Sequence, residues 1–128
     1  MRKSRWPVAK SDADFAPYLA GGNRQATGLF RRFVELARDL GPVTFELQRP
    51  AVVLCGNRRI FASVTTTQHG IGGIINLPRR VVDPRISRSE PLTKSLYLHR
   101  YAINRMSGLD PTFGGWLREA WLIGNEDS

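Results

Sequence analysis

Hydrophobic and polar positions recur at two spacings along this chain, and each spacing predicts a different kind of element. Between residues 23 and 40 the apolar residues come every three or four positions, which is typical of a helix with one buried face. Asn23 is a suitable N-cap. Gly41 and Pro42 end the helix, because glycine accepts a positive φ and proline cannot continue the hydrogen bonding. The buried stripe is expected to comprise Ala26, Leu29, Phe30, Phe33, Leu36, Ala37 and Leu40.

Four short β-type segments follow this helix, and only turn residues separate them. Val43, Phe45 and Leu47 alternate with polar residues, as in a strand with one buried face. The predicted strands cover residues 43–48, 51–55, 60–66 and 71–77. Connections this short join antiparallel neighbours but cannot form parallel crossovers, so the pattern predicts an antiparallel meander.

The last third of the chain contains a proline-rich segment, then a further predicted strand and a final predicted helix. Residues 78–93 include three prolines and most of a basic cluster, so we predict an irregular loop. Residues 96–103 then predict a fifth strand. Asp110 and Pro111 are suited to the N-cap and first turn of a final helix, whose apolar stripe includes Trp116 and Trp121.

These elements predict an α+β domain with two layers, in which two amphipathic helices pack on one face of an antiparallel five-stranded sheet. With 128 residues and 41% hydrophobic content, the chain has the size of one domain. We expect residues 1–13 to form a basic flexible tail, residues 14–124 a single domain and residues 125–128 a disordered C-terminus. The other sheet face would be left partly exposed, where a partner can bind.

The net charge of +8 indicates an anionic partner, although 16 of the 19 basic residues are arginine, a bias that a GC-rich genome also produces. The spacing of the charges supports a binding role, because seven basic residues lie between Arg79 and Arg105 with only Asp83 and Glu90 among them. Arginine's planar fork suits phosphate oxygens. We therefore predict that the protein is a module that binds a polyanion, and we favour nucleic acid as that partner.

The predicted interface consists of the arginine-rich loop and the last strand, gathered into one accessible patch. Its residues are Arg58, Arg59, Arg79, Arg80, Arg85, Arg88, Arg100 and Arg105, with Tyr97, His99 and Tyr101 interleaved. The arginines would contact phosphates and the exposed rings would stack on unpaired bases. Two alternatives stay open: a solvated loop beside core tyrosines, or a protein-interaction or small-ligand module with Tyr97, His99 and Tyr101 lining the open sheet face.

The sequence contains little that indicates catalysis or metal binding. The two histidines, His69 and His99, lie at no metal-ligand spacing from each other or from Cys55, the only cysteine. The carboxylates, Glu46 among them, form no cluster and are most simply surface ion pairs. We expect a non-enzymatic protein without metal or cofactor. The alternative of an enzyme stays open, and it would require His99 or Cys55 to meet a carboxylate or a second base in a cleft. The basic start of the chain leads into no apolar stretch, so we also expect a cytoplasmic location without membrane contact.

The order of several motifs resembles one bacterial family. The runs are Leu40-Gly41-Pro42-Val43, Val52-Val53-Leu54, Arg58-Arg59-Ile60-Phe61-Ala62-Ser63-Val64, Ile74 to Leu77 with Pro78-Arg79-Arg80, Asp83-Pro84-Arg85-Ile86, His99-Arg100, Leu109-Asp110 and Trp116-Leu117-Arg118-Glu119-Ala120-Trp121. Over residues 14–122 they are similar to the family known as domain of unknown function fifty-six fifty-five. That resemblance implies a small α+β domain, alone or joined to other modules, some nuclease-like, with no established reaction. Residues 65–67 are threonines where the family is often more basic, which weakens a phosphate-binding role for that hairpin.

Overall fold

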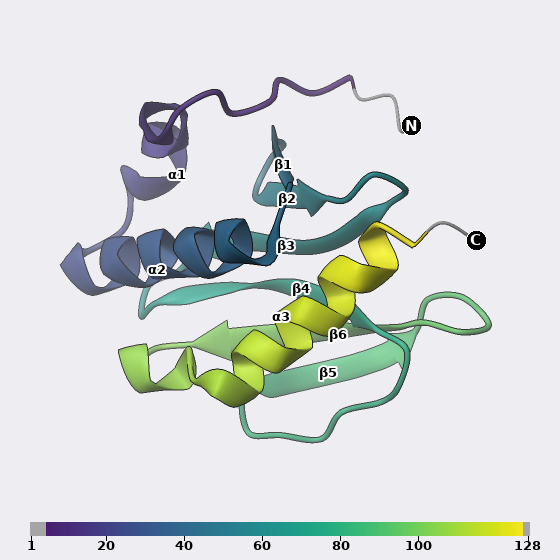
Figure 1. Cartoon of the computed structure of the whole chain (residues 1–128). Coiled ribbons are helices and arrows are strands. Elements are labelled where there is room, and N and C mark those ends of the chain that lie inside the picture. The colour runs from purple at the N-terminus through teal and green to yellow at the C-terminus, as the bar shows by residue number, and fades with distance from the viewer. Residues whose placement is uncertain (1–4, 127–128) are drawn as a thin grey trace.

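A six-stranded antiparallel sheet forms the centre of the molecule in the computed structural model, which describes residues 5–126. The strands are β1 (Thr44–Leu47), β2 (Val52–Cys55), β3 (Ile60–Thr66), β4 (Ile71–Leu77), β5 (Ile86–Pro91) and β6 (Tyr97–Ile103). Their order across the sheet is β1-β2-β3-β4-β6-β5, so β6 lies between β4 and β5 (Figure 1). The predicted α+β class and the antiparallel meander of the first four strands are confirmed.

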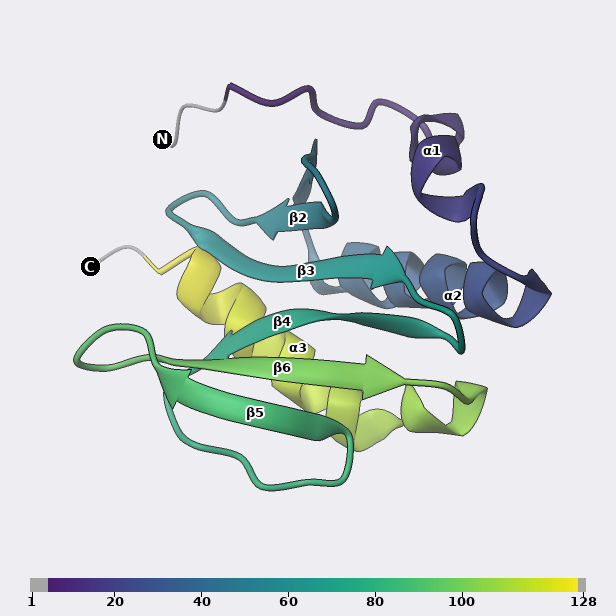
Figure 2. The ribbon, with the colours of Figure 1, turned by 180° about the vertical axis from the view of Figure 1, so that it is seen from behind.

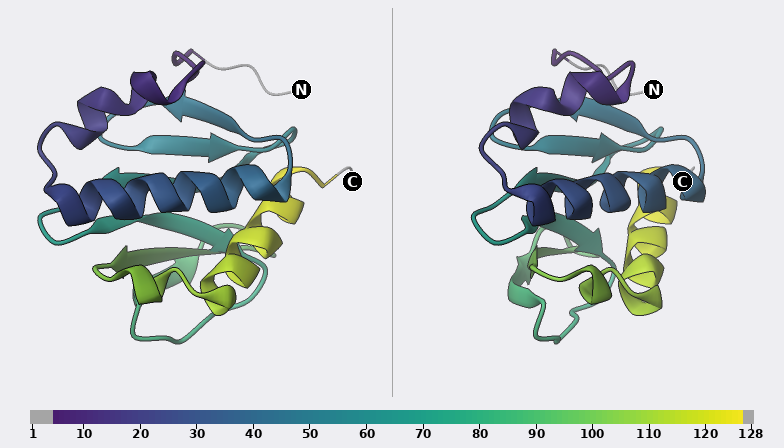
Figure 3. Two further views of the ribbon diagram at one scale, coloured as in Figure 1. Left: turned by 60° about the vertical axis from the view of Figure 1, so that its left-hand side comes forward. Right: turned by 90° about the vertical axis from the view of Figure 1, so that its left-hand side faces the viewer.

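Helices cover one face of this sheet and leave the other face uncovered. They are α1 (Ala16–Leu19), which continues the 3-10 helix η1 (Asp12–Phe15), then α2 (Arg24–Leu40), and α3 (Pro111–Gly124), which follows the 3-10 helix η2 (Met106–Gly108). Seen from behind, the strands have no helix in front of them (Figure 2). The side views show α2 and α3 on the same side of the sheet (Figure 3). We call the uncovered side the open face.

The two long helices begin and end where their sequences predict. The Asn23 side chain accepts a hydrogen bond from the Ala26 amide at 2.8 Å, and the Asp110 side chain accepts one from the Phe113 amide at 2.9 Å. Each bond satisfies an amide that the helix itself cannot pair. Gly41 ends α2 with a φ of 142°, a backbone conformation that residues with a side chain rarely adopt.

Aromatic side chains hold the helical layer against the sheet. Phe33 from α2 stacks on Tyr101 from β6, with ring centroids 5.9 Å apart. Phe113 from α3 meets the same tyrosine edge-on at 5.3 Å. All three are almost fully buried, and Trp116 beside them is 5% exposed. Packing of this kind orients the side chains of β6 toward the helices or away from them, which determines where each candidate residue lies.

The prediction of five strands and two helices is wrong in detail, because residues 86–91 form β5 and a short third helix, α1, also packs on the sheet. We predicted an irregular loop from the prolines of residues 78–93. Pro84 precedes β5 and Pro91 is its last residue, positions that an edge strand tolerates because only one side joins the ladder. With Arg88 and Glu90 in between, the strand lacks the apolar run of a central strand.

The start of the described chain runs along β1. The Ala9 amide donates to the Phe45 carbonyl at 2.9 Å, and the Leu47 amide donates to the Pro7 carbonyl at 2.8 Å. This contact helps to bury Glu46, which is only 1% exposed, so the expectation of a surface carboxylate there is wrong. The predicted division of the chain after residue 13 stays a prediction, and residues 1–4 and 127–128 of the predicted tails lie outside the described residues. Between residues 5 and 126, no helix has the length and hydropathy needed to cross a bilayer.

Candidate functional site

The sheet divides the predicted arginines into two groups, so the prediction of a single accessible patch is wrong. His99 and Tyr101 of β6 are 0% and 3% exposed on the helical side. Neighbouring residues of a strand point to opposite faces, so Arg100 between them lies on the open face. It stands opposite Ile74 of β4 and Arg88 of β5 in the ladders. The arginines of the loop before β5 contact the helical side instead.

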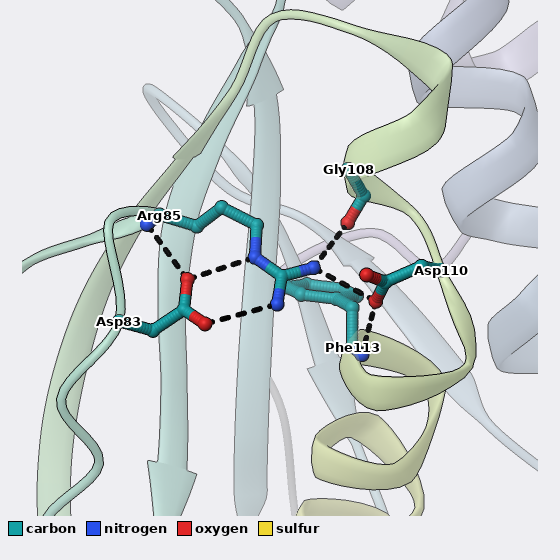
Figure 4. Close-up of polar contacts among 5 residues, drawn as sticks. All are labelled: Asp83, Arg85, Gly108, Asp110 and Phe113. Carbon is teal, nitrogen blue, oxygen red and sulfur yellow. Dashed lines mark hydrogen bonds and ion pairs between the residues drawn. The ribbon is translucent and has the colours of Figure 1, made fainter.

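Arg85 is the most enclosed of those loop arginines and joins the loop to the start of α3 (Figure 4). Its Nε and Nη2 donate to the two carboxylate oxygens of Asp83 at 2.9 and 3.1 Å. Its Nη1 donates to Asp110 Oδ1 and to the Gly108 carbonyl, both at 2.8 Å. The guanidinium carbon lies 4.8 Å from the centre of a Trp116 ring, and the side chain is only 18% exposed. Four donor contacts and one face of this guanidinium are therefore used within the fold.

The pKa values around Arg85 follow from these contacts. Hydrogen bonds from Arg85 lower the pKa of Asp83 below its usual value. The pKa of Asp110 is lowered first by the amide of Phe113 and then by Arg85. The hydrogen bonds that Arg85 donates to Asp83 and Asp110 outweigh burial and raise the pKa of Arg85. All three groups thus stay charged as a structural cluster near neutral pH.

Arg79 and Arg80 are also engaged on the helical side. Arg79 forms a two-pronged ion pair with Glu119 of α3, at 3.2 Å from Nε and 2.8 Å from Nη2. Arg80 lies over the ring of Tyr97 at 5.1 Å from its centre and donates to Ser89 at 3.4 Å. The guanidinium of Arg80 therefore occupies the ring face that we expected to stack on a base.

His99 and Tyr101 hold the backbone in place and lie away from the surface. The His99 Nε2 accepts the Val81 amide at 2.9 Å, so its Nδ1 carries the proton and faces the Tyr97 carbonyl at 3.1 Å. Burial lowers the pKa of His99 and keeps the ring neutral. Tyr101 donates to the Ser63 carbonyl at 2.7 Å, and burial raises its pKa well above 10.0. The idea that Tyr97, His99 and Tyr101 line the open face is therefore wrong.

A depression of about 640 Å³ lies on the open face instead, and we call it the open-face depression. Its floor consists of side chains from β3, β4 and β6, and the β2–β3 turn and the β5–β6 loop flank it. The lining residues are Asn57, Arg58, Arg59, Ile60, Ile74, Asn76, Leu92, Thr93, Leu96 and Leu98. An apolar floor with two arginines at its edge suits a ligand that has an apolar body and a negative charge.

The C-terminus of α3 fixes the turn that carries these two arginines. The amides of Arg58 and Arg59 donate to the Gly124 carbonyl at 2.8 and 3.1 Å. Gly56 closes the turn by donating to the Arg59 carbonyl at 2.9 Å, and a Cβ on Gly56 would lie 2.4 Å from the carbonyl carbon of Gly124. Only glycine allows this approach, so the positions of Arg58 and Arg59 depend on Gly56.

Positive charge predominates around the depression. Arg58 and Arg100 are exposed, and Arg59 is partly exposed. Among residues 5–126, Arg59 and Arg100 contact no carboxylate. Arg88 pairs with Glu90 at 3.2 Å on β5. We call Arg58, Arg59 and Arg100 the open-face arginines.

Arg105 is separate from these three arginines. It lies beyond the end of β6, beside a second hollow that Gly108 and Asp110 also line. The eight predicted arginines therefore include three on the open face around the depression, Arg88 next to Arg100, and four elsewhere.

Asn76 is a further polar residue of the depression, and sequence reasoning missed it. The residue is 5% exposed, its Nδ2 lies 3.5 Å from the Ile60 carbonyl, and its Oδ1 has no hydrogen-bond partner. A buried polar atom without a partner is uncommon in native proteins and calls for an explanation. Asn76 is the one amide in the apolar run of residues 71–77, and this was the available signal.

Comparison of the chain with family models, with curated proteins and with solved structures finds no match. The resemblance to the bacterial family of unknown function therefore stays a prediction. Within the described part of the chain, no three His, Cys, Asp or Glu side chains are grouped closely enough to bind a metal ion.

Proposed function

We propose that this protein is a non-enzymatic module that binds single-stranded nucleic acid across the open face of its sheet. The observation that carries the proposal is an apolar depression on a face that no helix covers, with Arg58 and Arg59 in its lining and Arg100 opposite Ile74 of its floor. The proposal keeps the partner class expected from the sequence. It replaces the arginine-rich loop with the open face as the interface.

The charge on the open face supports a polyanion as the partner. Arg59 lies in the turn just before β3 and Arg100 lies in β6, and β4 separates these two strands, so the cationic groups are spread along a surface as the phosphates of a nucleic-acid strand are. Guanidinium groups bind phosphate oxygens through two parallel hydrogen bonds, and binding releases the counterions condensed on the nucleic acid. This interaction needs no base sequence, so we expect broad specificity and strong salt dependence.

The apolar floor favours a single strand over a duplex. Ile74 and Leu98 are partly exposed at the floor, where they offer apolar surface to a flat ring. Bases in a duplex are stacked inside the helix, whereas those of a single strand can turn outward and lie on a protein surface. The open face offers no exposed tyrosine for stacking, and arginine guanidinium planes can take that part.

The alternative of a protein-interaction or small-ligand module loses its original basis. It relied on Tyr97, His99 and Tyr101 lining the open face, and these side chains lie on the helical side. The depression remains available to a small anion. Binding of mononucleotides with no gain in affinity for longer strands would support that alternative.

The direct test is an anisotropy titration of a fluorescent single-stranded oligonucleotide of about ten residues, a typical site size for a sheet-based binder, at several salt concentrations. The wild-type protein should bind, and the logarithm of its affinity should fall linearly with the logarithm of the salt concentration. The double variant Arg59→Ala/Arg100→Ala should have a slope shallower by about 0.7 for each lost phosphate contact.

A charge-matched variant separates local contacts from the net charge of the protein. Arg24→Ala/Arg31→Ala also removes two positive charges, but it removes them from exposed positions of α2, on the other side of the molecule. It should bind like the wild type. Equal losses in both double variants, or no binding by the wild type at low salt, would reject the open face as the interface.

A further inference from the structure

The geometry of the open-face depression points to a more specific role within this proposed function. We infer that the depression receives one unpaired nucleobase of the bound strand, and that the Asn76 carboxamide is its polar contact on the floor. Arg58 and Arg59 at the edge would then bind the phosphate next to that base. This inference rests on the proposed function, since it names the part of the ligand that occupies the site.

The size and lining of the depression fit a nucleobase. Its volume of about 640 Å³ lies within the usual range of ligand sites, about 300–1,000 Å³. Ile60, Ile74 and Leu98 line its floor, while Leu92 and Leu96 approach from the β5–β6 loop. These side chains provide apolar surface for the faces of a ring. None of the described residues that line it is a carboxylate, so within residues 5–126 the lining itself places no like charge against a phosphate at the edge.

Asn76 is the observation that selects a base over a purely apolar group. Its Oδ1 is buried without a partner, and its Nδ2 makes a single contact at 3.5 Å, the long limit of a hydrogen bond. The carboxamide therefore has both an acceptor and a donor to offer to a ligand that reaches the floor. The edges of nucleobases carry donors and acceptors side by side, and asparagine pairs with them through two bonds.

The arrangement of charge and apolar surface matches a nucleotide as a whole. The arginines belong to the β2–β3 turn, which the Gly124 carbonyl anchors, and Asn76 lies in the neighbouring strand β4. A ligand that spans both must place its negative group at the edge and its ring on the floor. A strand that binds through its phosphates alone would leave the floor and Asn76 unused.

The test compares two oligonucleotides of equal length and phosphate number, one with bases and one with abasic sugars throughout. Phosphate binding treats them alike, whereas a base site prefers the first. The wild-type protein should bind the base-bearing strand more tightly by about tenfold, within the range expected for a single well-bound base. The salt slope should be the same for both strands, because the phosphates are identical.

Variants then assign this preference to the floor. Asn76→Ala should reduce the preference for bases and leave the affinity for the abasic strand unchanged. Asn104→Ala is the matched control, because it removes an exposed amide outside the depression. A folded Asn76→Ala variant with the full preference for bases would overturn the role of Asn76.

A measurement on the unmodified protein applies if Asn76→Ala does not fold. Each of the four deoxynucleoside monophosphates is added to isotopically labelled protein, and the side-chain amide signals are followed by NMR. The Asn76 signals should shift with at least one nucleotide while those of Asn104 stay in place, and unmoved Asn76 signals would contradict the inference. Equal wild-type affinity for base-bearing and abasic strands would reject the base site and leave phosphate binding intact, whereas failure to bind either strand would reject both proposals.

Discussion

Two groups of arginines in this protein have the same chemistry and opposite surroundings. Arg79 and Arg85, in the loop before β5, contact carboxylates of the helical side, and the contacts of Arg85 enclose it. Arg59 and Arg100 border or adjoin the open-face depression and, among residues 5–126, contact no carboxylate. The first group is densest in the sequence and consists of structural residues. The second is spread over distant segments and meets only on the folded sheet.

The difference teaches that charge density along a chain is a poor guide to a binding surface. Arg85 lies two residues after Asp83, and this local pairing already neutralises part of the loop. Asp110 is remote in sequence and comes into contact with Arg85 only through the packing of α3. An arginine whose guanidinium already binds carboxylates and carbonyls of the fold, as that of Arg85 does, has fewer donors to offer to an external phosphate. The predictions below test this division, beginning with the largest expected change.

Replacing Arg85 should have the largest effect on stability and little effect on nucleic-acid binding. Arg85→Ala leaves Asp83, Asp110 and the Gly108 carbonyl without their shared donor and opens space against Trp116. We expect the free energy of unfolding, measured by urea denaturation, to fall by about 3 kcal/mol, the upper end for losing hydrogen bonds to a charged group. Arg79→Ala is the control, and its more exposed pair should contribute less than about 1 kcal/mol.

The binding of the folded Arg85→Ala protein completes this test. Its salt slope with single-stranded DNA should match that of the wild type, because Arg85 does not face the ligand. A shallower slope together with a small loss of stability would place Arg85 in the interface and remove the distinction between the two groups.

The second prediction concerns the support of the open-face arginines. Gly56→Ala places a methyl group against the backbone of Gly124, so the β2–β3 turn must move away from α3. We expect a loss of about 2 kcal/mol in the free energy of unfolding, as for other overpacked sites. Gly28→Ala, in α2 with no atom near its added Cβ, should instead stabilise the protein by up to about 1 kcal/mol.

The same variant links the turn to binding. Displacement of Arg58 and Arg59 should weaken the affinity for single-stranded DNA at low salt, while Gly28→Ala leaves it unchanged. Wild-type affinity in a Gly56→Ala protein with a displaced turn would show that these two arginines do not bind the strand.

Local patterns in the sequence predicted most of the fold. The period of the apolar residues predicted α2, and the caps Asn23 and Asp110 predicted where α2 and α3 begin. Alternation and short turns predicted β1 to β4. β5 was missed, because an edge strand pairs on one side only and needs little apolar surface, so Arg88 and Glu90 look like loop residues.

The candidate site was harder to predict, since it depends on contacts between distant segments. The burial of Tyr101 requires that Phe33 and Phe113 meet it from two helices, and the sequence does not specify their packing. The sequence does not distinguish whether Tyr97 and Tyr101 of β6 are buried or exposed, because the strand carries large side chains on both faces. The depression likewise requires a turn, a loop and three strands together. Its arginines were predicted, but its apolar floor and Asn76 were not.

The third prediction uses pH to release the loop before β5. Neutral His99 accepts the Val81 amide, and its folded pKa lies below the usual 6.5. The unfolded chain therefore binds a proton more readily, and stability is complete above pH 6.5 and falls as the pH drops through the folded pKa. We therefore expect the free energy of unfolding to fall as the pH is lowered from 7 to 5.

Urea denaturation at a series of pH values measures this effect. His99→Gln should flatten the profile in that range, and His69→Gln, which removes an exposed imidazole, is the control. The pKa values of Asp83 and Asp110 are also lowered, so their contribution is lost only at more acidic pH, below about 4. A profile of His99→Gln as steep as the wild type's would mean that the loop is not held through this imidazole.

The smallest change in stability is expected at Arg100, where binding should respond most clearly. Arg100 stands opposite Arg88 on neighbouring strands, and like charges in that position repel each other. Arg100→Ala should therefore change the free energy of unfolding by less than about 0.5 kcal/mol. Because the substitution removes the repulsion from Arg88, we expect this small change to be a gain in stability. The affinity for single-stranded DNA should nevertheless fall, and the salt slope should become shallower by about 0.7. An unchanged slope in this stable variant would mean that Arg100 lies outside the path of the strand, and would confine the interface to the β2–β3 turn and the depression.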